Sequence, residues 1–312
     1  MLTAKNECNR IVNNLKGITD LLDSEQDRNL LRDINFLDNY VSNQNFIISV
    51  FGSFNRGKST LLNALLGNKH LPAALIPTTG SAINIKYGIE LKTRIVLSNG
   101  TEIIEKGTEA LQNTKLNSER QMRSDIISVE MFIPHPLLKN DINLVDLPGT
   151  NDGEAQNELV RNQLFSTDLI INVLDASQLF TLTEAENLQS WLIEREITTV
   201  IFVVNFLNLL EVKDQIMVMQ RARFLAEQFR GNFPDRINNL YRVDALPALK
   251  AKLKGDMKTA FSTGILNFES ALQNIASVLS SELYKYRLPR VITICNQVKQ
   301  SLSAKIKTIE AE

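Results

Sequence analysis

Short apolar runs alternate with amphipathic stretches through the middle of the chain. Runs rich in β-branched residues predict strands, and stretches whose apolar residues are spaced by three and four predict helices. The predicted strands are 46–51, 83–87, 94–97, 126–133, 142–145, 169–174 and 200–204. The predicted helices are 59–66, 154–165, 183–194, 212–229 and about 257–282. This alternation is typical of an α/β fold with a mostly parallel, doubly wound sheet. Asn99-Gly100, between two extended runs, predicts a hairpin turn.

The two ends of the chain differ from the middle, because each carries one narrow apolar stripe at helical spacing. The N-terminal stripe comprises Cys8, Ile11, Leu15, Ile18 and Leu22, and the C-terminal stripe comprises Leu288, Val291, Cys295, Val298, Leu302 and Ile309. Each stripe needs a covering partner. We expect the two ends to pack together in a small helical bundle. The alternative is that each end packs separately on the α/β domain.

The charge balance limits the classes of partner. Lys and Arg number 34 and Asp and Glu 35, so the net charge is −1 and no basic footprint for nucleic acid is present. The N-terminus lacks the layout of a signal peptide, and the longest apolar run is too short to span a bilayer. These features predict a soluble, cytoplasmic chain. Cys8 and Cys295 form no metal or redox motif, and on apolar stripes they act as small hydrophobes, with a redox link as the alternative.

The segment GSFNRGKST, residues 52–60, lies between a predicted strand and a predicted helix. This frame and context indicate a phosphate-binding P-loop, in which backbone N–H groups cradle the phosphates. Lys58 adds positive charge against the β- and γ-phosphates, and the Ser59 hydroxyl binds Mg²⁺. The candidate nucleotide-binding residues of this segment are Gly52, Ser53, Phe54, Asn55, Arg56, Gly57, Lys58, Ser59 and Thr60.

Two further segments have the layout of γ-phosphate and magnesium contacts. In NLVDLPGTND, Asp146 ends a strand and would hold Mg²⁺ through water, while Gly149 lets its amide approach the γ-phosphate because it has no Cβ. In LPAALIPTTG, Thr78 and Thr79 lie in a proline-bounded loop, where a threonine can offer its hydroxyl to Mg²⁺. With the P-loop, these segments indicate a nucleoside triphosphatase.

The segments GSFNRGKST, LPAALIPTTG, NLVDLPGTND and VDALPALKAKL, in this order, resemble a bacterial dynamin-like GTPase of the cyanobacterial type. The resemblance implies GTP or GDP and Mg²⁺ as ligands, with Thr79 joining Ser59 and Asp146 at the metal. YRLPRV resembles the dynamin junction, at which Pro289 links the GTPase domain to a helical bundle. The implied organisation is bundle helices over 1–43, a GTPase domain over 44–288 and a bundle helix over 289–312.

Phe54 departs from the dynamin pattern, in which many members carry a polar residue that positions the attacking water. A phenylalanine cannot orient water by hydrogen bonding, so catalytic help must come from elsewhere. Arg56 is therefore a candidate arginine finger, within one molecule or across a dimer. The alternative is a solvated arginine or a salt bridge at the rim of the site. Related GTPases carry such an arginine one position earlier, where this chain has Asn55.

The base-reading motif of this chain also departs from the usual pattern. The segment reads NFLN, with Asn205 in place, Phe206 instead of lysine and Asn208 instead of aspartate. An asparagine offers one acceptor to the two guanine donors, so we expect weakened guanine selectivity. Asp244 could supply the missing carboxylate in the second base loop. Alternatively, Asp244 caps the helix that begins near Leu246.

The resemblance implies a mechanochemical GTPase that self-associates through its GTPase domains as a homodimer or higher oligomer. It further implies peripheral membrane association, with lipid bound through segments absent from this chain, which is either part of a longer protein or an abbreviated relative. A monomeric nucleotide-state switch that recruits an effector is the alternative, although a switch would not need the terminal helices. An ATPase or small-molecule kinase is disfavoured, because no catalytic base is evident and the PTT and DLPG segments are typical of switches.

Overall fold

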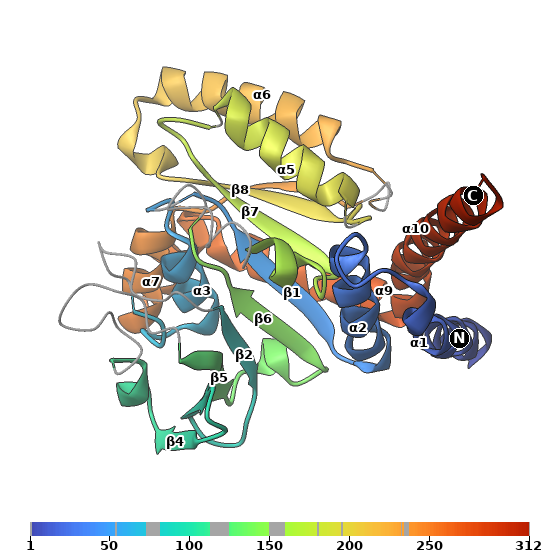
Figure 1. The fold of residues 1–312 in the computed structure, drawn as a ribbon. Coiled ribbons are helices and arrows are strands. Elements are labelled where there is room, and N and C mark those ends of the chain that lie inside the picture. Colours follow the sequence, from blue (N-terminus) through green and yellow to red (C-terminus); the bar gives the residue numbers. More distant parts are fainter. Residues whose placement is uncertain are drawn as a thin grey trace.

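The computed structural model describes residues 2–53, 55–72, 82–112, 125–149, 160–179, 181–194, 196–231, 233 and 237–311 (Figure 1). Within these ranges, nine strands form one sheet in the order β4-β3-β5-β2-β6-β1-β7-β8-β9. The strands are β1 (Phe46–Phe51), β2 (Ile83–Tyr87), β3 (Lys92–Leu97), β4 (Glu102–Lys106), β5 (Ile126–Ile133), β6 (Ile142–Asp146), β7 (Leu169–Asp175), β8 (Val200–Asn205) and β9 (Leu240–Arg242). Every predicted strand is present.

The sheet has a parallel half and a mixed half. β6, β1, β7, β8 and β9 pair in parallel, whereas β2 pairs antiparallel with β6, and β3 pairs antiparallel with both β4 and β5. The predicted hairpin is confirmed, because β3 and β4 are joined through Gly100, whose φ of 81° suits a glycine turn. β9 is a short strand that the sequence pattern did not predict.

Helices cover both faces of the sheet, as expected for a doubly wound fold (Figure 1). The α-helices are α1 (Leu2–Gly17), α2 (Arg28–Ser42), α3 (Lys58–Leu66), α5 (Leu182–Glu194), α6 (Val212–Gln228), α7 (Ala245–Leu253), α8 (Met257–Ser262), α9 (Ile265–Ser281) and α10 (Leu283–Ala311). Short 3₁₀ helices are η1 (Thr19–Leu21), η2 (Glu109–Gln112), η3 (Pro136–Leu138) and η4 (Leu207–Leu209). Of the predicted helix 154–165, residues 160–164 are described and helical, and 154–159 lie outside the described residues.

Side chains of β1 alternate between two cores. Ile48 and Val50 pack with α3, α7 and α9 on one face, whereas Ile47 and Phe51 pack with α5 and α6 on the other. Burial on both faces explains why the central strands read as continuous apolar runs. This packing holds the loops that follow the parallel strands in one place.

The single helix predicted over 257–282 is wrong, because the structure contains two helices there. Gly264 separates α8 from α9 with a φ of 85°. A Cβ at this position would collide with the backbone carbonyl of Arg242, so only glycine fits. The break is imposed by close approach of β9, a tertiary contact.

The two ends of the chain pack together, as their apolar stripes predicted. α1, α2 and α10 share a buried cluster that includes Cys8, Val12, Val291 and Val298, with Phe165 from the α/β domain packed into it. Both figures show α1 and α10 side by side, with the N- and C-terminal ends on the same side of the molecule in Figure 1. The C-terminal stripe is shorter than predicted. Leu302 is partly buried against the cluster, but Ile309 is 71% exposed.

α10 begins at Leu283 and runs without interruption through Pro289. The domain boundary predicted at residue 289 stays a prediction, and a continuous helix crosses it. In the described part of the chain, none of the helices combines the length and the apolar character needed to cross a bilayer.

Candidate functional site

The candidate site lies at one edge of the sheet, where the carboxyl ends of the parallel strands meet. The P-loop follows β1, Asp146 ends β6, Asn205 ends β8 and Asp244 follows β9. In open α/β sheets, ligands bind outside these strand ends. The structure therefore brings together motifs that are far apart in the sequence.

The P-loop owes its path to residues that tolerate left-handed backbone. Gly52 has a φ of 143°, and a Cβ there would lie 2.7 Å from the carbonyl oxygen of Val173 on β7. Gly57 has a φ of 89°, and a Cβ there would collide with the side chain of Asn205. Asn55 has a φ of 61°, a conformation that asparagine adopts more readily than most residues. The loop therefore packs tightly against β7 and β8.

Lys58 is buried at the first turn of α3, with 7% of its surface exposed. Its Nζ donates to the carbonyl oxygens of Gly52, at 2.8 Å, and Ser53, at 3.1 Å. These bonds hold the ammonium group inside the curve of the loop. A cation fixed there, beside the N-terminus of α3, is suited to bind phosphate.

Ser59 and Asp146 meet across the strand end. Ser59 Oγ donates to Asp146 Oδ2 at 2.7 Å, while Asp146 Oδ1 is buried and has no hydrogen-bond partner among the described residues. Burial raises the pKa of the Asp146 carboxyl, and the Ser59 donor and the Lys58 charge oppose this shift. A hydroxyl beside a buried carboxylate oxygen in need of a partner is a donor set that fits Mg²⁺, which binds through few carboxylates together with substrate phosphates.

Asn205 connects the P-loop to the loops that follow β8 and β9, which carry the predicted base-contacting residues. Its Nδ2 donates to the carbonyl oxygen of Arg56 at 2.9 Å. Its Oδ1 accepts from the backbone N–H groups of Phe206, at 2.9 Å, and Ala245, at 3.0 Å. One buried side chain thus fixes the spacing between the phosphate side and the base side of the site.

Asp244 and Asn208 also lie together, although 36 residues separate them. Asp244 Oδ1 accepts from the backbone N–H of Asn208 at 2.9 Å, and Oδ2 accepts from Arg242 Nη2 at 3.0 Å. Asp244 occupies the N-cap position of α7, but its side chain makes no capping hydrogen bond, so the helix-cap alternative is wrong. Its carboxylate is instead placed next to the segment NFLN, and base contact by Asp244 stays a prediction.

Arg56 is turned toward the β7–α5 side of the P-loop. Its Nη1 donates to the carbonyl oxygen of Gln178 at 2.7 Å, and its guanidinium pairs with Asp175, at 3.4 Å, and Glu184, at 3.6 Å. Burial alone would raise the pKa of Glu184, but hydrogen bonds from Ser53 and Thr181 and the charge of Arg56 outweigh burial and lower this pKa. The contacts favour the salt-bridge alternative over the arginine finger.

We therefore expect Arg56→Ala to lower GTP turnover less than about tenfold, whereas losing a true arginine finger costs about 10³-fold or more. The measurement is single-turnover hydrolysis together with nucleotide affinity. Arg56→Lys, which keeps the charge near Glu184, is the matched variant. A thousandfold loss of turnover at unchanged affinity would establish Arg56 as a finger.

The remaining predicted site residues divide into two groups. Thr60 lies in the first turn of α3, and Gly149 is buried in the loop after β6. Phe54 and Thr79 lie outside the described residues, so the roles predicted for both stay predictions. The structure thus places every predicted site residue that it describes at the same edge of the sheet.

A buried ion pair just before the start of β7, at the opposite end of the strands from the site, was not predicted. Arg287 on α10 donates through Nε and Nη2 to Asp168, at 2.9 and 2.7 Å, and neither side chain is exposed. Its other N–H groups reach the backbone carbonyls of Tyr40, Asn43 and Asn45. The one available signal in the sequence was an arginine beside the apolar stripe of the C-terminal helix.

These features define a P-loop GTPase domain. They are the phosphate loop after β1, the Ser59–Asp146 pair, and the Asn205 side chain that bonds this loop to the loops after β8 and β9, all on a doubly wound sheet. Residues 48–207, just over half of the chain, match the family model described as Dynamin family. The chain belongs to the dynamin family, and the resemblance seen in the four sequence motifs is confirmed.

The matching relatives are longer than this chain. "Bacterial dynamin-like protein" of Nostoc punctiforme is 28% identical over 295 residues, covering 86% of this chain and 42% of the relative. "Dynamin-like protein 1" of Campylobacter jejuni is 25% identical over 306 residues, covering 86% of this chain and 41% of the relative. A solved structure of an oligomerised bacterial dynamin pair, described as sensing and tethering membranes, shares the fold with a TM-score of 0.58. It is 22% identical, and the match covers 98% of this chain and 58% of that one.

Proposed function

We propose that this chain hydrolyses GTP and that hydrolysis is coupled to the association of two or more copies of the chain through their GTPase domains. The observation that carries the proposal is the buried Lys58 ammonium beside the Ser59–Asp146 pair. In this arrangement, the N-terminus of α3 and Lys58 bind the phosphates, and Gly149 lies in the loop after β6 that would approach the γ-phosphate. Phosphoryl transfer depends mainly on such positioning and charge stabilisation.

Ser59 and Asp146 would hold Mg²⁺, with Thr79 as a further proposed ligand. When bound, the ion neutralises charge that develops on the phosphates. Asp146 would orient a water molecule or the Ser59 hydroxyl around the ion, and the buried Oδ1 without a partner among the described residues supports this role. Ser59 keeps its hydroxyl in reach through its bond to Oδ2.

For Asp146→Ala we expect turnover and Mg²⁺ affinity to fall by about 10- to 100-fold, as is usual when a group that orients a metal's ligands is lost. GDP affinity should change little, because the diphosphate lacks the γ-phosphate. Hydrolysis as a function of Mg²⁺ concentration and GDP titration measure the two effects. Equal losses in both would assign Asp146 a purely structural role.

The second half of the proposal concerns the helical bundle. Arg287 on α10 contacts the end of α2 and the segment that joins it to β1. Its partner Asp168 accepts the backbone N–H of Ile47 on β1 at 3.0 Å. The bundle is therefore bonded to the base of the strand that leads into the P-loop. This connection supports a mechanochemical role, in which nucleotide-dependent dimerisation moves the bundle and the whole protein remodels membrane.

The test of coupling is the mass of the chain in solution by light scattering, with GDP, with a GTP analogue, and with GDP plus aluminium fluoride in the presence of Mg²⁺. We expect a dimer in the aluminium fluoride complex and monomer with GDP. A chain that stays monomeric in every state while hydrolysing GTP would instead be a nucleotide-state switch. Liposome binding by this chain tests whether lipid contact requires other segments.

A further inference from the structure

The α7–α8 surface consists of the exposed side chains of α7, α8 and the turn between them. These helices face the core with other residues, namely Ala248, Leu249, Ala251 and Ala260. The exposed apolar residues are Leu246, Leu253, Met257 and Phe261. Met257 and Phe261, which are 56% and 61% exposed, lie four residues apart and are therefore neighbours on one side of α8. A group of large apolar side chains outside the core indicates a surface that contacts a partner.

Positive charge lies among these apolar side chains. Residues 246–261 contain four lysines and one aspartate, a net charge of +3 in a chain whose net charge is −1. Lys252 is largely buried and pairs with Glu269 at 2.6 Å. The aspartate, Asp256, caps α8 by accepting the backbone N–H of Thr259 at 3.0 Å. The three lysines that remain exposed are Lys250, Lys254 and Lys258.

A second exposed apolar face, on α6, shows what the lysines add. α6 exposes Val212, Ile216 and Phe224, so its apolar character is comparable. Residues 211–227 carry three basic and three acidic side chains, however, and their net charge is zero. Of these two faces, the α7–α8 surface alone combines apolar side chains with net positive charge. This combination favours a partner that is both apolar and anionic.

The surface of a membrane that contains anionic lipid has both properties. Exposed leucine, methionine and phenylalanine side chains enter the boundary between headgroups and acyl chains, while lysines extend along it and keep their ammonium groups at the headgroups. Anionic lipid attracts lysines that lie close to the membrane. The apolar and basic side chains of the α7–α8 surface lie close enough in the chain to act together.

We propose that the α7–α8 surface binds membranes that contain anionic lipid. The inference rests on the proposed membrane role of the whole protein and assigns one lipid contact to this chain, whereas the resemblance in sequence implied contact through other segments. Figure 1 shows α7 on one side of the molecule and both chain ends on the other, so lipid at this surface leaves the bundle free. The end of α8 is also bonded to the candidate site, because the carbonyl oxygen of Thr263 accepts the backbone N–H of Asp244 at 3.0 Å.

The test is cosedimentation of the chain with vesicles of phosphatidylcholine, either alone or mixed with phosphatidylserine. We expect the wild type to bind the mixed vesicles and to bind phosphatidylcholine alone far more weakly. The decisive variant combines Lys250→Gln, Lys254→Gln and Lys258→Gln. It should bind the mixed vesicles about 100-fold more weakly, since each lysine near an anionic surface contributes about fivefold.

The matched control combines Lys213→Gln, Arg221→Gln and Arg223→Gln on α6. It removes the same amount of charge from the chain but should weaken vesicle binding by less than about threefold, because charges far from the lipid are screened. Phe261→Ser and Phe224→Ser form a second matched pair. Loss of the Phe261 ring should weaken binding by about tenfold, whereas Phe224→Ser should have no effect. GTP turnover without vesicles should be unchanged in all four variants, which shows that each is folded.

Equal losses of vesicle binding in the two triple variants, or wild-type binding that does not depend on phosphatidylserine, would overturn the inference. A wild-type chain that hydrolyses GTP and binds neither kind of vesicle would overturn it as well, and the proposed hydrolysis would stand. The opposite result is also distinct. Vesicle binding that depends on the α7–α8 lysines, in a chain that hydrolyses no GTP, would refute the proposed hydrolysis and support the lipid contact.

Discussion

Lys58→Ala is expected to reduce GTP turnover by at least about a hundredfold and to remove most triphosphate binding. The side chain is the buried cation of the P-loop, and its Nζ is held by the carbonyls of Gly52 and Ser53. Losing one preorganised charge-stabilising donor typically costs 10²- to 10³-fold in turnover. Phosphate release at saturating GTP and titration with a GTP analogue measure the two effects.

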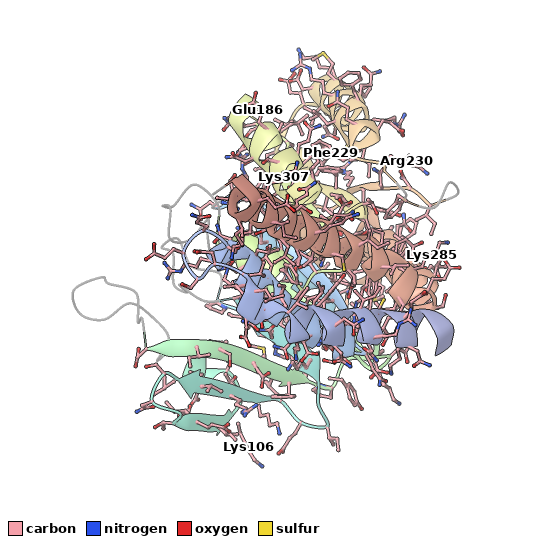
Figure 2. The ribbon with its side chains drawn as sticks, turned by 45° about the vertical axis from the view of Figure 1, so that its right-hand side comes forward. Lys106, Glu186, Phe229, Arg230, Lys285 and Lys307 are labelled. Carbon is pink, nitrogen blue, oxygen red and sulfur yellow. The ribbon has the colours of Figure 1, made fainter. Side chains whose placement is uncertain are left out.

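The matched control is Lys106→Ala. Lys106 lies on β4 at the distant edge of the sheet, with its side chain 84% exposed, and it is labelled in Figure 2. Its loss should leave turnover unchanged. If Lys58→Ala hydrolysed GTP at the rate of Lys106→Ala, the P-loop would have no catalytic role in this chain.

Arg287→Met is expected to lower the free energy of unfolding by about 3–5 kcal/mol. Removing one partner of a buried ion pair leaves the other charge, here Asp168, uncompensated. The backbone carbonyls of Tyr40, Asn43 and Asn45 lose their donor at the same time. Such a loss is a large share of the 5–15 kcal/mol that is typical of folded domains. Urea denaturation monitored by circular dichroism gives the value.

Two companion variants separate the ion pair from a general effect on α10. Lys285→Ala removes a side chain that is 68% exposed, labelled in Figure 2, and should change stability by no more than about 0.5 kcal/mol. Arg287→Met combined with Asp168→Asn should cost less than the sum of the single changes, because the double variant leaves no unpaired buried charge. Additive losses would show that the pair does not act as a unit.

Burial acts against the charged form of Arg287, yet the contacts with Asp168 outweigh it and raise the pKa of the guanidinium. The tyrosine ring of Tyr40 also lies 4.5 Å from the guanidinium carbon. The planar guanidinium donates to Asp168 and to backbone carbonyls in other directions, so a lysine would not replace this arginine. At this junction between the bundle and the α/β domain, the Arg287 guanidinium makes contacts that a lysine ammonium group could not all reproduce.

Local features of the fold follow from the sequence by itself. The strands around the site were predicted because their apolar runs must be buried on both faces, and the hairpin because Asn99-Gly100 suits a tight turn. The P-loop was predicted because its glycines, lysine and serine act within one short segment. In each of these features, neighbouring residues suffice to define the backbone geometry.

The tertiary structure alone determined the contacts between residues that are remote in the chain. The Arg287–Asp168 pair spans 119 residues, and the contact between Asn208 and Asp244 spans 36. The break at Gly264 depends on the approach of Arg242, and the inward turn of Arg56 depends on Glu184 of α5. The spacing of apolar residues along the chain does not predict these contacts. The path of the folded backbone determines which side chains meet, and the resulting burial influences their charge states. For the same reason, the sequence alone showed Phe206 only as a departure from a motif, whereas the fold placed its ring beside Gly57.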